Sequence, residues 1–472
     1  MRLILLLACL FPVFGSVAQP QRLSVSKNQR FLVREDGTPF FWLGDTAWEL
    51  FHRLDREQAD RYLQRRAEQG FTVVQAVALA ELDGLHAPNA YGDVPLRDDD
   101  PTQPLTTPGN APDDTTQYDY WDHVDWMVDR AAALGLYVGL LPTWGDKVFK
   151  NSWGTGPEIF TPENARAYGA WIGRRYADRP NLIWIIGGDR NPRANADDLA
   201  IWRALAEGVE QGVGGRDKAL LTFHPQPTEH GSSSNWFQQD AWLDFNMHQT
   251  GHCRDLPVYD RMQEDYALTP VKPTLNGEPI YEDHPVCFNA AENGYSYASD
   301  IRKAAYLSLF AGAFGHTYGC HNVWQMWAPG RTPVNGPLKP WYESLDLPGA
   351  VDLHHVRWLL ESRPMLDRVP DPLLLASEPG SAAERVQATR GRDYAFVYSA
   401  AGRPFTVNMG LIRGRQVRAT WYDPRTGRAL PAETLPNRGT NAFVPPSAGL
   451  GQDWVLILDD VAQDYPLPQQ QK

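Results

Sequence analysis

Eight apolar segments alternate with helix-like segments along the first three quarters of the chain, and this alternation constrains the fold more than any other feature. The segments are mostly apolar throughout rather than alternately apolar and polar, which is typical of strands buried on both faces of a parallel sheet. Eight such units predict a (β/α)8 TIM barrel with loop insertions over residues 22–366. An open, doubly wound sheet is the alternative, but the sequence has neither a GxGxxG fingerprint nor a P-loop. The eight segments are PFFWLGD (39–45), FTVVQAVAL (71–79), YVGLLPTW (137–144), LIWIIGGD (182–189), KALLTFHP (218–225), DFNMHQT (244–250), KPTLNGEP (272–279) and GAFGHTYGCHNVW (312–324).

Helix ends and turns carry their own signals. Asp55 precedes a helical segment that Gly70 ends. Thr161 and Pro162 give another helix a capping residue and a proline at its first position. Asp36–Gly37 lies between two apolar arms and predicts a tight hairpin, whose second arm, PFFWLGD, is expected to be the first barrel strand.

After Pro364 the pattern changes to short apolar segments separated by Gly, Pro and Asn. This spacing predicts a second, all-β domain over residues 370–461, a small β-sandwich. The connection RPMLDRVPDP is short and proline-rich, so we expect the sandwich to pack on the barrel rather than to swing freely. Residues 462–472 are predicted to be a disordered tail.

The N-terminus, MRLILLLACLFPVFGSVA, has the features of a secretory signal peptide over residues 1–18, with cleavage near Ala18. Its apolar run is too short for a membrane anchor, and Cys9 comes too early for a lipoprotein signal. We therefore expect a secreted or periplasmic protein. The formal net charge of −13 argues against general binding to nucleic acid or to an anionic membrane.

Three cysteines remain after removal of the signal: Cys253, Cys287 and Cys320. An odd number in an oxidising compartment allows one internal disulfide at most, and Cys253–Cys287 is the slightly preferred pair. The spacing of the cysteines and histidines does not match a metal site, and there is no HExxH motif. We expect neither a metal nor a cofactor.

In a TIM barrel the active site lies at the carboxyl ends of the strands. The long polar connection over residues 81–120 follows the second strand and is predicted to form a wall of the substrate cleft. The residues at the strand ends are predicted to line the same mouth as substrate-binding groups. They are Asp45, Trp48, Gln75, Trp144, Arg190, Asn191, His224, His248, Gln249, His316, Tyr318 and His321.

Two carboxylates, Asp189 and Glu278, directly follow apolar strands and have glycine beside them, which lets a ligand approach the backbone closely. Two carboxylates at one apolar mouth suit glycoside hydrolysis, in which one protonates the leaving oxygen and the other attacks the anomeric carbon or activates water. The surrounding Trp and Tyr residues offer flat faces to sugar C–H groups. A Ser–His–Asp hydrolase is disfavoured, because no GxSxG motif lies at a strand end.

Four motifs in this order resemble a known family: FFWLGDTAWELFHRL (40–54), WIIGGDRNP (184–192), LNGEPIYE (275–282) and GHTYGCHNVWQMW (315–327). Together they look like the apiosidase-like barrel of glycoside hydrolase family 140, over roughly residues 23–365. WYDPRTG (421–427) and DWVLIL are similar to the small β domain that accompanies this barrel.

The resemblance implies endo-apiosidase activity, cleavage of the bond between apiose and the galacturonan backbone of the pectin rhamnogalacturonan II. It implies that Asp189 is the acid/base and Glu278 the nucleophile of a retaining mechanism. Many retaining barrels have Asn just before the acid/base, where it contacts the sugar 2-hydroxyl, whereas this sequence has Gly188. Asn191 and His248 are the candidates to replace that contact.

Two other functions remain open at this point: a glycosidase acting on another furanoside or a plant glucan, and a non-catalytic carbohydrate-binding protein. If the substrate is a galacturonan branch, its carboxylates need cationic partners. Four cations follow strands that open into the mouth and are the candidates: Lys147, Lys150, Arg190 and Arg254.

Overall fold

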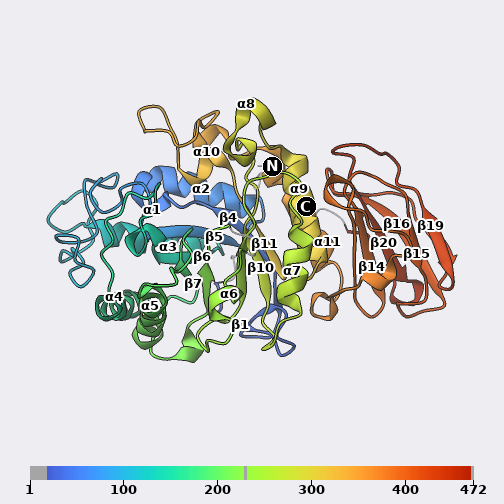
Figure 1. Cartoon of the computed structure of the whole chain (residues 1–472), viewed down its shortest axis with the longest axis horizontal. Helices are drawn as coiled ribbons and strands as arrows, with labels where there is room; N and C mark the ends of the chain where they lie inside the picture. The colour runs from blue at the N-terminus through green and yellow to red at the C-terminus, as the bar shows by residue number, and fades with distance from the viewer. Residues whose placement is uncertain (1–18, 228–230, 469–472) are drawn as a thin grey trace, which may run out of the picture.

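The computed structural model describes residues 19–227 and 231–468. Eight parallel strands form one sheet in the order β8-β7-β6-β5-β4-β11-β10-β9 (Figure 1). Its two outer strands, β8 and β9, also meet, because the Thr222 hydroxyl donates to the Phe245 carbonyl at 2.7 Å and the Asp244 N–H donates to the Leu221 carbonyl at 2.9 Å. The predicted (β/α)8 barrel is therefore confirmed. The strands are β4 (Trp42–Thr46), β5 (Val73–Leu79), β6 (Tyr137–Thr143), β7 (Leu182–Gly187), β8 (Leu221–His224), β9 (Asn246–Gln249), β10 (Thr274–Glu278) and β11 (Gly315–Tyr318).

Helices surround the strands, and the predicted capping residues start two of them. The Asp55 carboxylate accepts the N–H of Gln58 at 2.8 Å at the start of α2. Thr161 accepts the N–H of Asn164 at the start of α4, whose first residue is Pro162. No described helix is long and apolar enough to cross a membrane. The helices are α1 (Leu50–Arg53), α2 (Arg56–Glu68), α3 (Tyr120–Ala133), α4 (Pro162–Arg175), α5 (Asp198–Val213), α6 (Ser234–Phe237), α7 (Val258–Tyr266), α8 (Ala290–Asn293), α9 (Ala298–Phe310), α10 (His321–Trp324) and α11 (Pro348–Glu361).

A small antiparallel sheet precedes the barrel. It consists of β1 (Leu23–Val25), β2 (Leu32–Arg34) and β3 (Pro39–Phe40). The β2–β3 turn is the predicted hairpin, and Gly37 takes a φ of +82° there, a conformation that favours glycine. The predicted second arm is divided, because β3 pairs with β2 whereas the barrel strand β4 begins at Trp42 in another sheet.

The C-terminal domain is all β, with its own apolar core, which includes Val397, Val407 and Leu456. One antiparallel sheet has the order β12-β13-β14-β20-β16-β17, with β18 paired to β16, and a second sheet pairs β15 with β19. The strands are β12 (Val369–Pro370), β13 (Val386–Arg390), β14 (Tyr394–Ser399), β15 (Phe405–Asn408), β16 (Gln416–Asp423), β17 (Arg428–Ala429), β18 (Glu433–Pro436), β19 (Thr440–Phe443) and β20 (Trp454–Asp460).

The β domain packs against α9 and α11 of the barrel, as Figure 1 shows. Tyr306 of α9 stacks on Tyr398 of β14, with ring centroids 4.8 Å apart. Arg302 of α9 binds the carboxylate of Asp453 at 2.7 Å. Because these groups are buried and aromatic side chains of both domains share one core, the two domains are held together as the proline-rich connection predicts.

The ends of the chain differ from each other. The predicted signal peptide, residues 1–18, lies outside the described residues. At the other end, the Tyr465 hydroxyl donates to Asp393 at 2.8 Å and the Pro466 carbonyl accepts from Arg363 at 3.0 Å. The packed chain therefore continues past residue 461, where the sequence predicts a disordered tail.

Candidate active site

A cavity of about 530 Å³ opens at the carboxyl ends of the barrel strands. Its volume is typical of small-ligand sites, which span roughly 300–1,000 Å³. Asp189 and Glu278 both line it, together with four of the predicted substrate-binding residues: Trp48, Trp144, Gln249 and His321. The other lining residues are Glu81, Leu82, Trp153, Gln226, Pro227, His252, Tyr281, His284, Phe288, Trp324, Val334 and Asn335.

Glu278 ends β10 and is held from both sides. The Tyr281 hydroxyl donates to its Oε1 at 2.6 Å, and the Trp48 indole N–H donates to the same hydroxyl at 3.2 Å. Nε2 of His224 lies 2.9 Å from Oε2, and Nε2 of His252 lies 3.4 Å from Oε1. Burial alone would raise the pKa of Glu278, but its interactions with the two histidines outweigh burial and lower it. Glu278 is therefore held in its ionised form.

Asp189 follows β7, which ends at Gly187, after one further glycine, Gly188, and it has a left-handed backbone with φ of +50°. Its carboxylate lies 3.0 Å from the Arg190 guanidinium and accepts the Trp153 indole N–H at 3.3 Å. Burial and the negative charge of Glu278 raise the pKa of Asp189, and the charge of Arg190 offsets only part of this. The two carboxylates thus have opposite tendencies, because Asp189 retains a proton more readily and Glu278 loses one more readily.

One imidazole connects the two. Nδ1 of His224 accepts the backbone N–H of Asp189 at 3.2 Å, which leaves the Nε2 proton to face Glu278. His224 itself is fully buried and does not line the cavity, so its place is behind the carboxylates rather than against substrate.

Gly188 shows why this chain lacks the asparagine found before the acid/base in many retaining barrels. Its φ is +135°, and a Cβ atom there would lie 2.7 Å from the Trp144 ring and 3.0 Å from the backbone N of Gly145. Any side chain at residue 188 would displace Trp144 from the cavity wall. Neither proposed replacement lines the cavity.

Asn191 and His248, the two candidates to replace that contact, bind other residues instead. The Asn191 side chain accepts the backbone N–H of Gln226 at 2.9 Å and so supports a lining residue from behind. His248 lies 2.7 Å from Asp265 of α7 and points out of the barrel, while its neighbour Gln249 points in.

Four more of the predicted substrate-binding residues are buried away from the cavity. Asp45 binds Arg66 of α2 at 2.7 Å, outside the strand layer. Tyr318, its registered partner on β11, points the same way and donates to Glu282 at 2.7 Å. His316 has the same parity as Tyr318 and is fully buried. Gln75 points inward but lies below the mouth, where it donates to the Gly277 carbonyl at 3.1 Å.

The four predicted cations do not reach the cavity either. Lys147 is buried against Asp146 at 2.8 Å, and Arg190 is buried beside Asp189. Arg254 binds Asp300 at 3.0 Å on a neighbouring loop, and Lys150 does not line the cavity. No Lys or Arg is among the cavity-lining residues of the described chain, which corrects the expectation of a cationic mouth.

Most of the loop residues that line the cavity were not predicted from the sequence. The 81–120 connection supplies only Glu81 and Leu82, because its later part packs elsewhere; for example, the Pro95 carbonyl accepts the Trp121 indole N–H at 3.0 Å. Tyr281 had a usable signal, since it stands three residues after Glu278 in the quoted motif. Trp153 and His252 belong to loops without a periodic pattern and had none.

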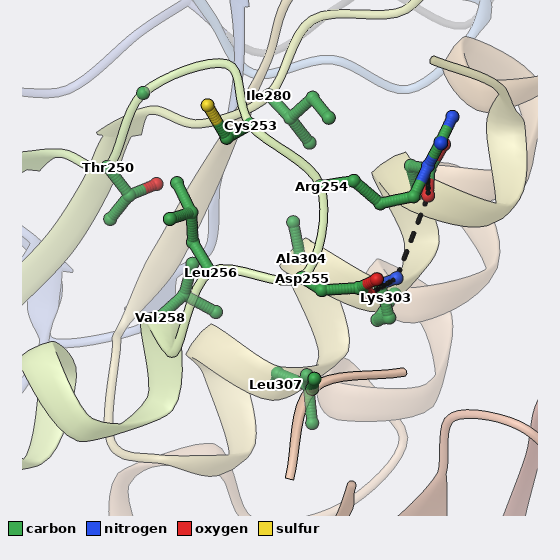
Figure 2. A pocket seen from close by; sticks show the side chains of 13 residues that line it. Thr250, Cys253, Arg254, Asp255, Leu256, Val258, Ile280, Lys303, Ala304 and Leu307 are labelled. Carbon is green, nitrogen blue, oxygen red and sulfur yellow. Dashed lines mark hydrogen bonds and ion pairs between the residues drawn. The ribbon is translucent and has the colours of Figure 1, made fainter. Parts of the chain in front are cut away.

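The Cys253–Cys287 disulfide is present, as preferred from the sequence, and Cys320 is free and buried. It joins two loops that carry cavity residues, since Cys253 follows His252 and Cys287 precedes Phe288. The Cys287 N–H also donates to the His252 carbonyl at 3.0 Å. Figure 2 shows the Cys253 loop lying over α9, where Lys303 of that helix pairs with Asp255. The small cavity that these residues help to line has a volume of about 20 Å³, enough for one water.

No group of three or more His, Cys, Asp or Glu side chains in the described parts of the chain is arranged to hold a metal ion. Three imidazoles of the wall pack together instead: the rings of His252 and His284 stack, and His321 packs edge-on against His284. His252 lies beside Glu278, and the other two rings bind backbone carbonyls. His284 shares a hydrogen bond with the Pro285 carbonyl at 2.7 Å, and His321 shares one with the Asn335 carbonyl at 3.2 Å.

Comparison with known proteins identifies the family of the chain. The family profile described as the apiosidase-like catalytic domain matches residues 26–367, and the one described as "Putative collagen-binding domain of a collagenase" matches residues 369–459. A solved structure described as "Glycoside hydrolase" is 35% identical, with a TM-score of 0.84, over 94% of this chain and 98% of that chain. A glycoside hydrolase family 5 structure from Bacteroides vulgatus ATCC 8482 is 33% identical, with a TM-score of 0.85, over 95% of each chain. No curated protein matches. This chain is a glycoside hydrolase and belongs to the apiosidase-like family.

Proposed function

We propose that this glycosidase is secreted or periplasmic and cleaves the bond between apiose and galacturonic acid in rhamnogalacturonan II side chains. We further propose that it works by double displacement, with Glu278 as the nucleophile and Asp189 as the acid/base. The observation that carries the mechanism is the opposite tuning of the two carboxylates: the pKa of Glu278 is lowered and that of Asp189 is raised. A nucleophile must be ionised and a general acid must be protonated before the first step.

In the first step, Glu278 attacks the anomeric carbon while Asp189 transfers its proton to the glycosidic oxygen, and the leaving sugar departs with that proton. The Tyr281 hydroxyl and the His224 ring hold the nucleophile in place. The product of this step is an ester between Glu278 and the sugar.

In the second step, Asp189 takes a proton from water, and the resulting hydroxide oxygen attacks the anomeric carbon and releases Glu278 as a carboxylate. The ester has no charge, so the negative charge that raises the pKa of Asp189 is gone at this stage. The pKa of Asp189 therefore falls, and the residue can act as a base.

The proposed substrate rests on the family and on the cavity lining, which is rich in aromatic residues and, among the described residues, includes no Lys or Arg; such a lining suits an uncharged sugar such as apiose. A furanoside other than apiose is the second candidate, since the same lining would accept it. Purified enzyme incubated with rhamnogalacturonan II oligosaccharides tests the choice, with the released side chain identified by mass spectrometry. Release of a chain that ends in apiose is the expected result. Hydrolysis of other furanosides without any action on these oligosaccharides would contradict the proposed substrate but not the proposed mechanism.

A further inference from the structure

The cavity has two chemically different walls. The wall around Glu278 comes from the loops after β9, β10 and β11 and carries His252, Tyr281, His284 and Phe288. The opposite wall comes from the ends of β5, β6 and β7 and carries Glu81, Trp144, Trp153 and Asp189. In the proposed mechanism the nucleophile contacts the sugar that becomes esterified, and the acid/base contacts the oxygen of the departing sugar. The β5–β7 wall therefore borders the leaving group.

Trp153 has the properties of a sugar platform on that wall. Its side chain is 49% exposed, although the residue lines the cavity. The Arg190 guanidinium carbon lies 4.6 Å from the ring centroid and supports one face of the indole. Arg190 is itself fixed, since its guanidinium donates to the Phe149 carbonyl at 3.0 Å and contacts Asp189. The indole is thus held rigidly while much of its surface remains available to a ligand.

The indole N–H ties this platform to the chemistry. It donates to Oδ2 of Asp189 at 3.3 Å, so the platform lies next to the proton that the leaving oxygen receives. A sugar bonded to that oxygen would therefore lie on the Trp153 side of the cavity.

Glu81 supplies a polar group on the same wall. It follows β5, and its backbone is fixed because the carbonyl before it, that of Ala80, accepts from Lys147 at 2.6 Å. The side chain is partly exposed, and it makes no hydrogen bond or ion pair with the described residues. Burial and the negative charges of Asp189 and Asp146 raise its pKa well above the usual value. A carboxyl group accepts hydrogen bonds from sugar hydroxyls, and in its protonated form it also donates one.

Resting on the proposed double displacement, we propose that Trp153 and Glu81 form the leaving-group subsite. The departing sugar stacks on the indole, and Glu81 hydrogen-bonds to its hydroxyls. The subsite takes an uncharged sugar face, because no lining Lys or Arg of the described chain could pair with a carboxylate there. A galacturonate leaving group would direct its carboxylate to solvent or be bound as its methyl ester.

The test compares two substrates that share the released sugar but differ in leaving group. One is the oligosaccharide, and the other is the glycosyl fluoride, which has no leaving sugar. Trp153→Ala should lower kcat/KM on the oligosaccharide about tenfold or more, and lower it on the fluoride by a clearly smaller factor. Trp153→Phe keeps a stacking ring but lacks the N–H and should lose less than Trp153→Ala on the oligosaccharide. Equal losses of Trp153→Ala on both substrates would overturn the subsite.

Comparing Glu81→Gln with Glu81→Ala tests whether the subsite needs a polar group at residue 81. Gln keeps a donor and an acceptor in nearly the same place, so it should retain most of the oligosaccharide activity that Ala loses. Equal loss in both variants would remove Glu81 from the subsite. Tyr297→Ala is the matched control, because Tyr297 is 64% exposed but does not line the cavity, and its kinetics should equal those of the wild type.

A separate measurement tests the preference for an uncharged leaving sugar. The wild type should hydrolyse the substrate with a methyl-esterified leaving sugar faster than the free acid, and a preference for the free acid would contradict the uncharged subsite. Failure of the proposed function gives a different result: the wild type and the Trp153 variants would all release nothing from pectic oligosaccharides. The fluoride of whichever sugar is released then still tests the subsite.

Discussion

Nε2 of His224 lies 2.9 Å from Oε2 of Glu278, and the opposite nitrogen of the same ring accepts the backbone N–H of Asp189. One buried imidazole therefore fixes the proposed nucleophile and the backbone of the proposed acid/base at once. It also helps to keep Glu278 ionised. Four predictions concern this arrangement and its surroundings, and a fifth concerns the disulfide.

His224→Ala should lower kcat/KM by about 100-fold, because it removes a hydrogen bond to an ionised group and releases Asp189. The pKa of Glu278 should rise, so the acidic limb of the pH profile should move to higher pH. His248→Asn is the control: it alters an equally buried histidine that pairs with Asp265 and touches neither carboxylate. A limb that moved equally in both variants would contradict the role of His224.

Glu278→Gln should abolish turnover on every substrate, because no ester can form. Asp189→Asn should spare the first step for substrates with good leaving groups, which need no protonation. Added azide should then restore turnover of Asp189→Asn and yield a glycosyl azide of the same anomeric configuration as the substrate. Direct NMR observation of the first-formed anomer in the wild type checks retention. An inverted product would overturn the assigned roles.

Asp189→Asn should also make the protein more stable at neutral pH. The pKa of Asp189 is raised in the folded state, so its contribution to stability is fully present below its unfolded pKa and is lost as the pH rises through the folded pKa. Asparagine has no charge to lose, and the gain should be on the order of 1 kcal/mol at pH 7 to 8. Thermal unfolding at pH 7.5 and at pH 4 measures it. A gain as large at pH 4 would show that the carboxylate charge is not its source.

Gly188→Ala should destabilise the protein by about 2–3 kcal/mol and reduce activity, since its Cβ would meet the Trp144 ring at 2.7 Å in a backbone with φ of +135°. Gly37→Ala is the matched control. Gly37 also has a positive φ, of +82°, but a Cβ there would have no atom within 4 Å. That variant should lose some stability and keep its kcat. Normal activity in Gly188→Ala would show that Trp144 can move without loss of function.

Loss of the disulfide should impair the Glu278 wall as well as stability. The bond closes a loop of 34 residues, worth about 3–4 kcal/mol by chain entropy. The double change Cys253→Ser and Cys287→Ser should lower the melting temperature and also kcat, because His252 adjoins one half of the bond. Thiol titration of the denatured, unreduced wild type should find one thiol after signal removal, that of Cys320. Three thiols would mean that the bond does not form.

Much of the architecture could be predicted from local pattern. Apolar runs predicted most of the barrel strands, because a strand buried on both faces favours apolar residues. The alternation with helical segments predicted the short, more polar strands β9 and β11. Asp189 and Glu278 could be predicted for the same reason: each is the first charged residue after such a run, and parallel strands end at a common mouth. The short turn-separated segments likewise predicted the all-β domain.

The orientation of the other strand-end residues was decided by the tertiary structure. Adjacent residues point to opposite faces of a strand, so Gln249 enters the cavity while His248 faces α7. Asp45 and Tyr318 are in register, and both point out of the barrel. There Asp45 binds Arg66 of α2, and Tyr318 donates to Glu282 in the loop after β10. Which strand-end side chains face the cavity depends on the register of each strand relative to its neighbours. The sequence pattern alone does not contain that register.

The cavity walls needed the tertiary structure for a different reason. Trp153, His252 and Phe288 belong to loops whose path follows no periodicity, and each is placed by long-range contacts: Trp153 by Arg190, and the other two loops by the disulfide. The chain sequence thus determined the barrel and its pair of carboxylates through local burial, whereas the folded structure determined which side chains surround the sugar, because those contacts join segments far apart in sequence.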